Sequence, residues 1–468
     1  MKKIAVTLAF TFIASFVWGQ QFSLYNSLTL YDAFENPSQR AFQADSSRKF
    51  AFNLLVPTVS FNGTFSGPAQ SNFKSLIYNR VVDGRNLVIG QGDMSTLTGH
   101  SNNYMLMFRI FRSVDYNQEF GFSWQIRNDG RANVSNETFA LLDNYRHFQE
   151  KNQYQNIFNN NGYNQSYNQY SFSYREDYNK RLSLGVKLSL LSGITYNKLD
   201  IKQSTLNIRP DLDEYDVIVK GNYKSNFVDS DLNSGIINPT FSDPGLSVSL
   251  GSSYKFKGGW FLMGNLKDIG FIKWNKESYN YDLNNEIKID NASLTSADEQ
   301  LKDETSEMLK SIRTTGSYTT LINGKAEALL NKDYGDYQPN LIVSKNLFYP
   351  GGHVALVNNY KLKNLIFTAT ADYNLDKYLQ IGGQFMIKTP NVEFFIGSDQ
   401  LFKTFQSSLS LISDNPELGD SYSAASGYLG FALKFGRTME RQANANFIPG
   451  VNSDYDRVGF FRRLFGRR

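Results

Sequence analysis

The sequence predicts an all-β fold, an antiparallel transmembrane outer-membrane β-barrel of about 14–16 strands with short loop helices. Three observations support this prediction. The chain begins with a segment typical of export, apolar and polar residues alternate along most of its length, and aromatic residues make up 15% of its 468 residues. No run of 18 apolar residues follows residue 20, so the sequence predicts no membrane-spanning helix.

Composition excludes several kinds of chemistry. The chain has no Cys, which rules out disulfides, thiolate catalysis and Cys-based metal sites, and its net charge of +4 argues against a nucleic-acid partner. The three histidines, His100, His147 and His353, do not show metal-ligand spacing, and the Asp-rich stretches 211–216 and 229–231 are interpreted as solvated turns rather than Ca²⁺ sites. We therefore predict no cofactor, no metal and no enzyme, although a lone Ser and His on strands could still serve an outer-membrane lipase.

Residues 1–19 are predicted to be a signal peptide. Lys2 and Lys3 precede the uncharged apolar stretch Ile4–Trp18, which is too short to span a bilayer comfortably. Small residues at the expected positions before cleavage leave Gln20 as the mature N-terminus. The alternative is an N-terminal membrane anchor. Residues 20–46 then form an N-terminal segment ahead of the alternating region.

Residues 47–436 are predicted to form the barrel. In Phe120–Arg127 and in Leu182–Leu190, for example, large apolar residues alternate with Gly, Ser, Gln, Lys or Arg. A soluble β-sandwich or propeller would need a second sheet to cover so many apolar faces, whereas lipid covers them in a membrane barrel. If Trp260–Leu283 is one kinked strand, the barrel has about 16 strands. If residues 199–208 and 215–223 form only an extracellular hairpin, it has about 14 strands.

Three segments are predicted not to be strands. Gln153–Gln169 is rich in Asn, Gln and Tyr, and we expect a solvated loop. Ser296–Ile312 has apolar residues at helical spacing, with Ser296 and Glu299 placed as a capping box. Thr138–Phe148 is expected to be a second short helix. Long loops are also expected at 67–102, 129–166, 224–243 and 401–424.

The last alternating segment resembles the signal that the barrel-assembly machinery reads in a final strand. It has a polar aromatic residue, then Gly, then two apolar positions of which the last is Phe: Tyr428, Gly430, Leu433 and Phe435. This resemblance implies that the assembly machinery is a partner and that residue 435 closes the barrel.

Residues 437–468 are predicted to be a basic periplasmic tail. Its end carries five Arg and no acid, interleaved with Phe and Leu: Arg457, Arg462, Arg463, Arg467 and Arg468. An even strand number places this tail on the side of the N-terminus, in the periplasm. It could contact anionic lipid or an acidic partner, or be a solvated end.

Several stretches resemble a family of Bacteroidota outer-membrane barrels known only as a domain of unknown function, within the wider FadL-like group. They are Tyr167–Gly193, Asp243–Phe256 and Asp268–Asn275, and Glu35–Ser38 (ENPS) is similar to an N-terminal element of FadL-like chains. The resemblance implies that residues 20–46 are a lumen hatch, with Asn36, Pro37 and Ser38 as its element.

The predicted function is passive transport of small or hydrophobic solutes in a FadL-like manner. The alternative is a structural or accessory subunit of a secretion or envelope-assembly complex, which would bind partners through the tail and the long loops. We expect outer-membrane lipid and the barrel-assembly machinery as partners in either case, with a secretion or envelope protein in the second.

Overall fold

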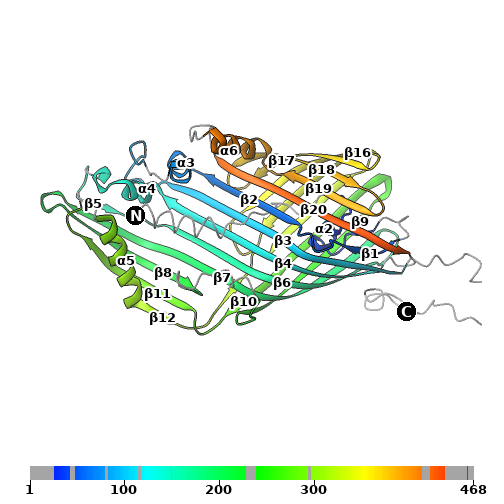
Figure 1. Cartoon of the computed structure of the whole chain (residues 1–468), viewed down its shortest axis with the longest axis horizontal. Coiled ribbons are helices and arrows are strands. Elements are labelled where there is room, and N and C mark those ends of the chain that lie inside the picture. Colours follow the sequence, from blue (N-terminus) through cyan, green and yellow to red (C-terminus); the bar gives the residue numbers. More distant parts are fainter. Residues whose placement is uncertain are drawn as a thin grey trace, which may run out of the picture.

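A computed structural model of the chain describes residues 26–42, 48–79, 83–113, 118–148, 150–227, 239–292, 297–413, 422–437 and 461. The predicted signal peptide, Asp229–Asp231, Ser296 and the five tail arginines lie outside the described residues. Figure 1 shows long, tilted strands that form a curved wall.

The strands form one closed antiparallel barrel of 14 strands, so the barrel prediction is confirmed with its lower strand count. The strand segments are β1 (Arg48–Phe52), β2 (Val59–Ser66), β3 (Met94–Ser113), β4 (Gln118–Ser135), β5 (Gln153–Gln155), β6 (Asn161–Asp177), β7 (Leu182–Arg209), β8 (Glu214–Ser225), β9 (Pro244–Lys255), β10 (Trp260–Trp274), β11 (Tyr279–Ile289), β12 (Arg313–Thr315), β13 (Tyr318–Leu321), β14 (Lys325–Lys332), β15 (Tyr337–Asn346), β16 (Gly352–Leu362), β17 (Leu365–Asn374), β18 (Tyr378–Lys388), β19 (Val392–Ser398) and β20 (Ser423–Arg437).

Several segments combine into single interrupted strands. β1 and β2 both pair with β20 and β3, which closes the barrel. β8 and β9 both pair with β7. β10 continues into β11 as one interrupted strand, an arrangement from which we expected about 16 strands rather than the 14 observed. β12, β13 and β14 follow one another along β11 and β10. The short β5 adds only to the end of β7.

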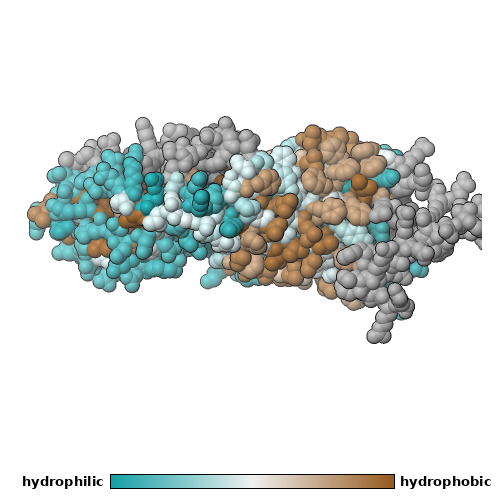
Figure 2. Space-filling model, turned by 90° about the horizontal axis from the view of Figure 1, so that it is seen from below, coloured by the Kyte–Doolittle hydropathy of each residue, from teal (hydrophilic) through white to brown (hydrophobic). Residues whose placement is uncertain are grey.

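The outer face of the barrel is apolar and the inner face is polar. Along β17, exposed Phe367 and Tyr373 alternate with buried Thr368, Thr370 and Asp372. Figure 2 shows the exposed apolar side chains gathered over one half of the molecule and hydrophilic ones over the other half. This is the arrangement of a barrel that crosses a membrane with one half and projects with the other.

The two sides of the barrel differ in height. β7 has 28 residues and β3 has 20, whereas β14 has 8 and β19 has 7. We call the end where Arg48 pairs with Arg437 the near end, and the opposite end, where the long strands project, the far end. The projecting part has its own apolar core, between β5, β7, β8 and β11 on one side and helices on the other.

The helices are α2 (Leu30–Glu35), α3 (Gln70–Asn79), α4 (Asn136–Asp143), α5 (Ala297–Ile312) and α6 (Leu401–Ser413), with the short 3₁₀ turns η1 (Tyr145–Phe148), η2 (Pro210–Leu212) and η5 (Lys257–Gly259). Helices were expected over 296–312 and 138–148, and α5, α4 and η1 lie there. No helix in the described part of the chain is long and apolar enough to cross a bilayer.

Two loop predictions were wrong. Residues 161–169 belong to β6, and most of their side chains are buried, although the sequence indicated a solvated loop. The loops expected at 67–102 and 129–166 are shorter, because β3 begins at Met94 and β4 ends at Ser135. These strand ends lie in the projecting part, where no lipid requires an apolar outer face, so the alternation that marks the membrane strands is absent.

Candidate functional site

Residues 26–42, here called the lumenal segment, lie inside the barrel. Their short helix α2 has a capping box, in which the Thr29 hydroxyl accepts from the Asp32 backbone N–H and the Asp32 carboxylate accepts in return. Every residue of α2 is buried. Partners of the segment lie on strands around the barrel, including β3, β4, β7, β10, β18 and β19.

Wall side chains bind both ends of α2. A carboxylate lies at the helix N-terminus and N–H donors lie at its C-terminus, as the helix dipole favours. At the first turn, the Leu30 backbone N–H donates to the Glu393 carboxylate over 2.9 Å. At the last turn, three wall side chains donate to carbonyl oxygens that have no partner within the helix: Arg109 to Ala33 (2.6 Å), Lys187 to Phe34 (3.3 Å) and Asn265 to Glu35 (3.0 Å). The wall therefore holds the backbone of α2 as well as its side chains.

The turn that follows α2 packs on two adjacent glycines. Asn36 caps the helix and its side-chain oxygen accepts from the backbone N–H and hydroxyl of Ser38, both over 2.9 Å. Gly185 and Gly251 are register partners on β7 and β9. A Cβ at Gly185 would lie 2.1 Å from the carbonyl oxygen of Pro37, and one at Gly251 would lie 2.2 Å from the Asn36 side-chain oxygen. Only glycine at both positions allows so close an approach.

A buried charged cluster surrounds Glu35. A β-bulge in β10 between Leu266 and Ile269 turns both Lys267 and Asp268 toward the lumen. Lys267 forms an ion pair with Glu35, and Asp268 forms ion pairs with Lys187 (3.2 Å) and Arg127. Asp268 has 0% side-chain exposure, so its charge depends on these partners.

The electrostatics of α2 follow from this cluster. Burial alone would raise the pKa of Glu35, but the ammonium groups of Lys267 and Lys187 and the Arg127 guanidinium lower it to about 2. Glu35 therefore stays ionised at any mildly acid pH. Its carboxylate also accepts from the Tyr104 hydroxyl over 2.6 Å.

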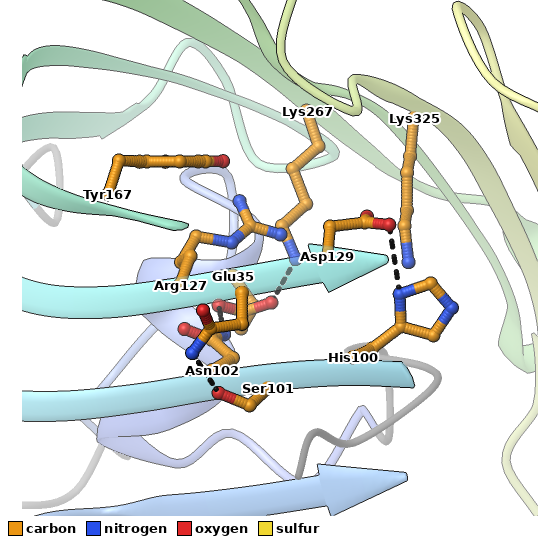
Figure 3. A pocket seen from close by; sticks show the side chains of 10 residues that line it. Glu35, His100, Ser101, Asn102, Arg127, Asp129, Tyr167, Lys267 and Lys325 are labelled. Atoms are coloured by element: carbon orange, nitrogen blue, oxygen red, sulfur yellow. Dashed lines mark hydrogen bonds and ion pairs between the residues drawn. The ribbon is translucent and has the colours of Figure 1, made fainter. Parts of the chain in front are cut away.

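The space left beside the lumenal segment is small. A cavity of about 20 Å³ lies between Glu35, Arg127, His100, Asp129 and Lys325, which is room for about one water molecule. Figure 3 shows Lys267 and Arg127 directed toward Glu35, and His100 directed toward Asp129, to which its Nδ1 lies at 3.3 Å.

A second feature lies in the wall near the far end. β19 pairs with β18 only up to Ser398 and with β20 only up to Gly397. Beyond these pairs, no strand of the described residues lies between β18 and β20, and α6 packs there instead. Thr404 accepts from the backbone N–H of Ser426 (2.9 Å), and Ser407 donates to the carbonyl of Ala424 (3.0 Å). Hydroxyl groups of α6 thus replace part of the strand ladder.

A pocket of about 970 Å³ lies at this interruption. Tyr378 and Gln400, which are buried on the lumen side, line it together with Leu379, Ile381 and Phe402, which are 57%, 47% and 64% exposed on the outer face. The pocket is therefore lined by residues from both faces of the wall, together with residues at the far ends of β2 and β3 such as Ser66 and Met94. The Tyr422 hydroxyl spans the interruption and donates to the Leu379 carbonyl over 2.7 Å.

The predicted assembly-signal residues all lie on β20. Tyr428 and Gly430 are buried on the lumen side, whereas Phe435 is 44% exposed on the lipid side, with its ring 5.6 Å from that of Phe50 on β1. A Cβ at Gly430 would lie 2.2 Å from the Phe395 ring. Leu433 pairs with Phe52. Their role in assembly stays a prediction, as does the role of the tail. Of the tail, only Arg437, at the end of β20, and Phe461 are described, and the Phe461 ring lies 5.8 Å from that of Tyr174.

The remaining candidates are placed apart from one another. His147 contacts Asp143 near α4, and His353 is buried on β16. In the Asp-rich stretch 211–216, Asp213 accepts from Tyr145 and Asp216 pairs with Arg209.

The chain belongs to a family of unknown function (DUF5723), whose model matches residues 41–399, well over half of its 468 residues. This confirms the resemblance to a barrel family known only as a domain of unknown function, while its assignment to Bacteroidota stays a prediction. A search of curated proteins gave no match.

Solved structures with the same kind of barrel include the toluene transporter TbuX of Ralstonia pickettii (8% identity, TM-score 0.43), a FadL homologue of Pseudomonas aeruginosa (11%, 0.43) and the toluene transporter TodX of Pseudomonas putida (8%, 0.44). Each comparison covers 90% of this chain and 97% of the other. The likeness concerns the fold.

Sequence reasoning missed the residues that hold the lumenal segment. Lys187 and Arg127 were placed on the polar face of their strands, and ionisable residues inside a membrane-spanning element are a usable signal of function. The inward turn of Asp268 depends on a β-bulge, and the pairing of Gly185 with Gly251 joins strands that are not consecutive. Neither feature can therefore be recognised from the neighbouring residues in the sequence.

Proposed function

We propose that this protein is an outer-membrane barrel for passive passage of small apolar solutes, in which the lumenal segment acts as a hatch. The wall opening beneath α6 then connects the far end of the lumen with the lipid. The observation that carries the proposal is the pocket of about 970 Å³ at the interruption between β18 and β20, which is lined by residues from both faces of the wall.

The chemistry of this pocket suits an apolar solute. Its outer mouth is formed by Leu379, Ile381 and Phe402, which join the apolar belt of the barrel. A solute that leaves the lumen here enters lipid without crossing water, and apolar surface favours that transfer by roughly 25 cal/mol per Å². The charged cluster around Glu35 disfavours the entry of an apolar solute, because the solute would separate buried ionic groups from their partners.

The outer face of α6 fits a position against lipid. Phe402 and Phe405 are 64% and 65% exposed, and Leu409 is 40% exposed on the same helix. Such residues at spacings of three and four form one face, which lipid at the membrane surface would cover. In Figure 1, α6 lies beside the far-end parts of β18 and β20.

The proposal is tested by narrowing the outer mouth of the pocket. Ile381→Trp should slow the entry of the apolar fluorescent probe N-phenyl-1-naphthylamine into intact cells that carry the protein. The matched control is Ile396→Trp, because Ile396 on β19 is 46% exposed to lipid, against 47% for Ile381, but does not line the pocket. Equal entry rates for the two variants would refute the route.

The projecting half of the barrel favours a second candidate, an accessory subunit of an envelope complex. The long β7 and β8 and the helix α5 present a polar surface beyond the apolar belt. Crosslinking in native membranes followed by purification distinguishes the candidates. A stoichiometric complex would support the accessory role, and a lone barrel would count against it.

A further inference from the structure

Two carboxylates and an amide gather on the lumen side of the short wall, near the far end. Asp372 on β17 and Gln380 on β18 are register partners whose side chains both face the lumen. Such partners have their Cβ atoms about 4.5–5.5 Å apart. Both residues have 0% exposure, so neither side chain reaches bulk water.

The third member of the group, Asp399, enters through a space left by a glycine. Gly382 lies two residues from Gln380 on the same face of β18, and a Cβ there would lie 2.8 Å from the Cα of Asp399. Asp399 is itself 1% exposed. Asp399 therefore lies directly beside the face of β18 that carries Gln380.

Two members of this group, Asp372 and Gln380, have polar side-chain atoms that the described part of the chain does not satisfy. Both carboxylate oxygens of Asp372 and both polar atoms of the Gln380 amide lack a hydrogen-bond partner there, and Asp372 forms no ion pair with a described residue. A buried carboxylate without partners costs several kcal/mol. Native proteins satisfy such groups with a donor, a water molecule or an ion.

We propose that Asp372, Asp399 and Gln380 bind a calcium ion. Carboxylate and amide oxygens are the ligands that Ca²⁺ takes in proteins, and two carboxylates balance its charge. The three side chains supply part of the 6–8 oxygens that Ca²⁺ requires, and bound water would supply the rest. Mg²⁺ fits less well, because it demands near-ideal octahedral geometry.

The ion would join two elements that the strand ladder leaves apart. Asp372 and Gln380 belong to the β17–β18 hairpin, whereas Asp399 lies between β19 and α6. Bound calcium would therefore hold the start of α6 against β18. An effect of calcium on solute passage rests on the proposed function, but the site itself does not.

Calorimetric titration of the calcium-depleted, full-length barrel in detergent tests the site. We expect one Ca²⁺ to bind the wild-type chain, and affinity to fall by at least about tenfold in Asp372→Asn and in Asp399→Asn. Asp303→Asn is the matched control, because Asp303 is exposed on α5. Absence of binding to the wild type, or equal affinity in wild type and Asp372→Asn, would overturn the proposal, and equal affinity for Mg²⁺ would overturn the choice of calcium.

Thermal unfolding gives a second readout that does not depend on transport. Calcium should raise the unfolding temperature of the wild type and leave that of Asp372→Asn unchanged. In the presence of EDTA, Asp372→Asn should unfold at the same temperature as the wild type or above it, because the substitution removes a buried carboxylate that no described residue satisfies. A lower temperature in EDTA, with no calcium response in the wild type, would identify Asp372 as a hydrogen-bonded structural acid and overturn the site.

Discussion

The lumen and the wall beneath α6 are closed by two different kinds of contact. The lumenal segment is held by buried charges and by wall side chains that bind the backbone of α2 at both ends. The interruption between β18 and β20 is closed by a helix, two hydroxyl groups and the Tyr422 hydroxyl. Separating buried charges costs several kcal/mol, whereas a neutral hydrogen bond contributes about 1 kcal/mol.

This difference indicates which closure moves more easily. The lumenal segment would lose several buried ion pairs and hydrogen bonds on leaving, so its displacement is the more costly of the two. A shift of α6 would break a few neutral hydrogen bonds, and lipid would cover its exposed Phe402 and Phe405. Under the proposed function, the barrel would stay closed to ions while it passes apolar solutes through its wall.

The largest effect is expected from removing the lumenal segment. Deletion of residues 21–46 should leave a folded barrel that conducts ions in discrete steps in a planar bilayer, because strands β1–β20 remain closed on themselves. The wild type should conduct far less. Equally low conductance of both forms would show that other groups close the lumen.

Breaking the charged cluster should have the next largest effect. Lys267→Ala leaves Glu35 without its ion pair and Asp268 with fewer cations nearby, so we expect a loss of about 3–5 kcal/mol in the free energy of unfolding. Denaturant unfolding in detergent measures it. Lys273→Ala, which removes an exposed Lys from the same strand, should change stability by less than about 0.5 kcal/mol.

Crowding the glycine pair should move the lumenal segment without removing it. Gly185→Val places side-chain atoms on the carbonyl of Pro37, and we expect a cost of about 1–3 kcal/mol and a rise in ion conductance. The control is Gly264→Val, because the nearest atom to a Cβ there is the Ser252 hydroxyl at 3.5 Å. A conductance rise in the control alone would contradict this account.

The smallest effect concerns α6. Thr404→Val removes the group that bonds to the backbone of Ser426, which should cost about 1–2 kcal/mol and speed the entry of the apolar probe. Ser408→Ala, which removes an exposed hydroxyl from the same helix, should leave entry unchanged. Slower entry in Thr404→Val would indicate that α6 does not restrict the route.

The membrane part of the fold could be predicted from sequence, and the projecting part could be predicted only in part. Strands such as β17 alternate because lipid covers one face and the lumen the other, and this pattern identified them. Residues 161–169 were taken for a loop because β6 there is polar on both faces, with cover from neighbouring elements rather than from lipid.

The candidate site could be predicted less well than the fold. Asn36–Ser38 were identified by resemblance, but their contacts with Gly185 and Gly251 depend on strand pairing between distant segments. The wall interruption likewise depends on contacts between segments that are distant in the sequence. Nothing in the sequence of Val392–Ser398 marks where β19 stops, because its end is set by the hydroxyl contacts of α6 with β20.

A reversible crosslink of α6 tests the central claim most directly, because the natural chain has no Cys. The hydroxyl oxygens of Ser398 and Thr404 lie 3.2 Å apart, so Ser398→Cys with Thr404→Cys can form a disulfide that ties α6 to the end of β19. Ser135→Cys with Thr138→Cys, from a similar hydroxyl pair 3.0 Å apart at α4, is the control. We predict that oxidation slows entry of the apolar probe only in the first pair and that reduction restores it. Equal entry in the oxidised and reduced forms of that pair would contradict passage beneath α6.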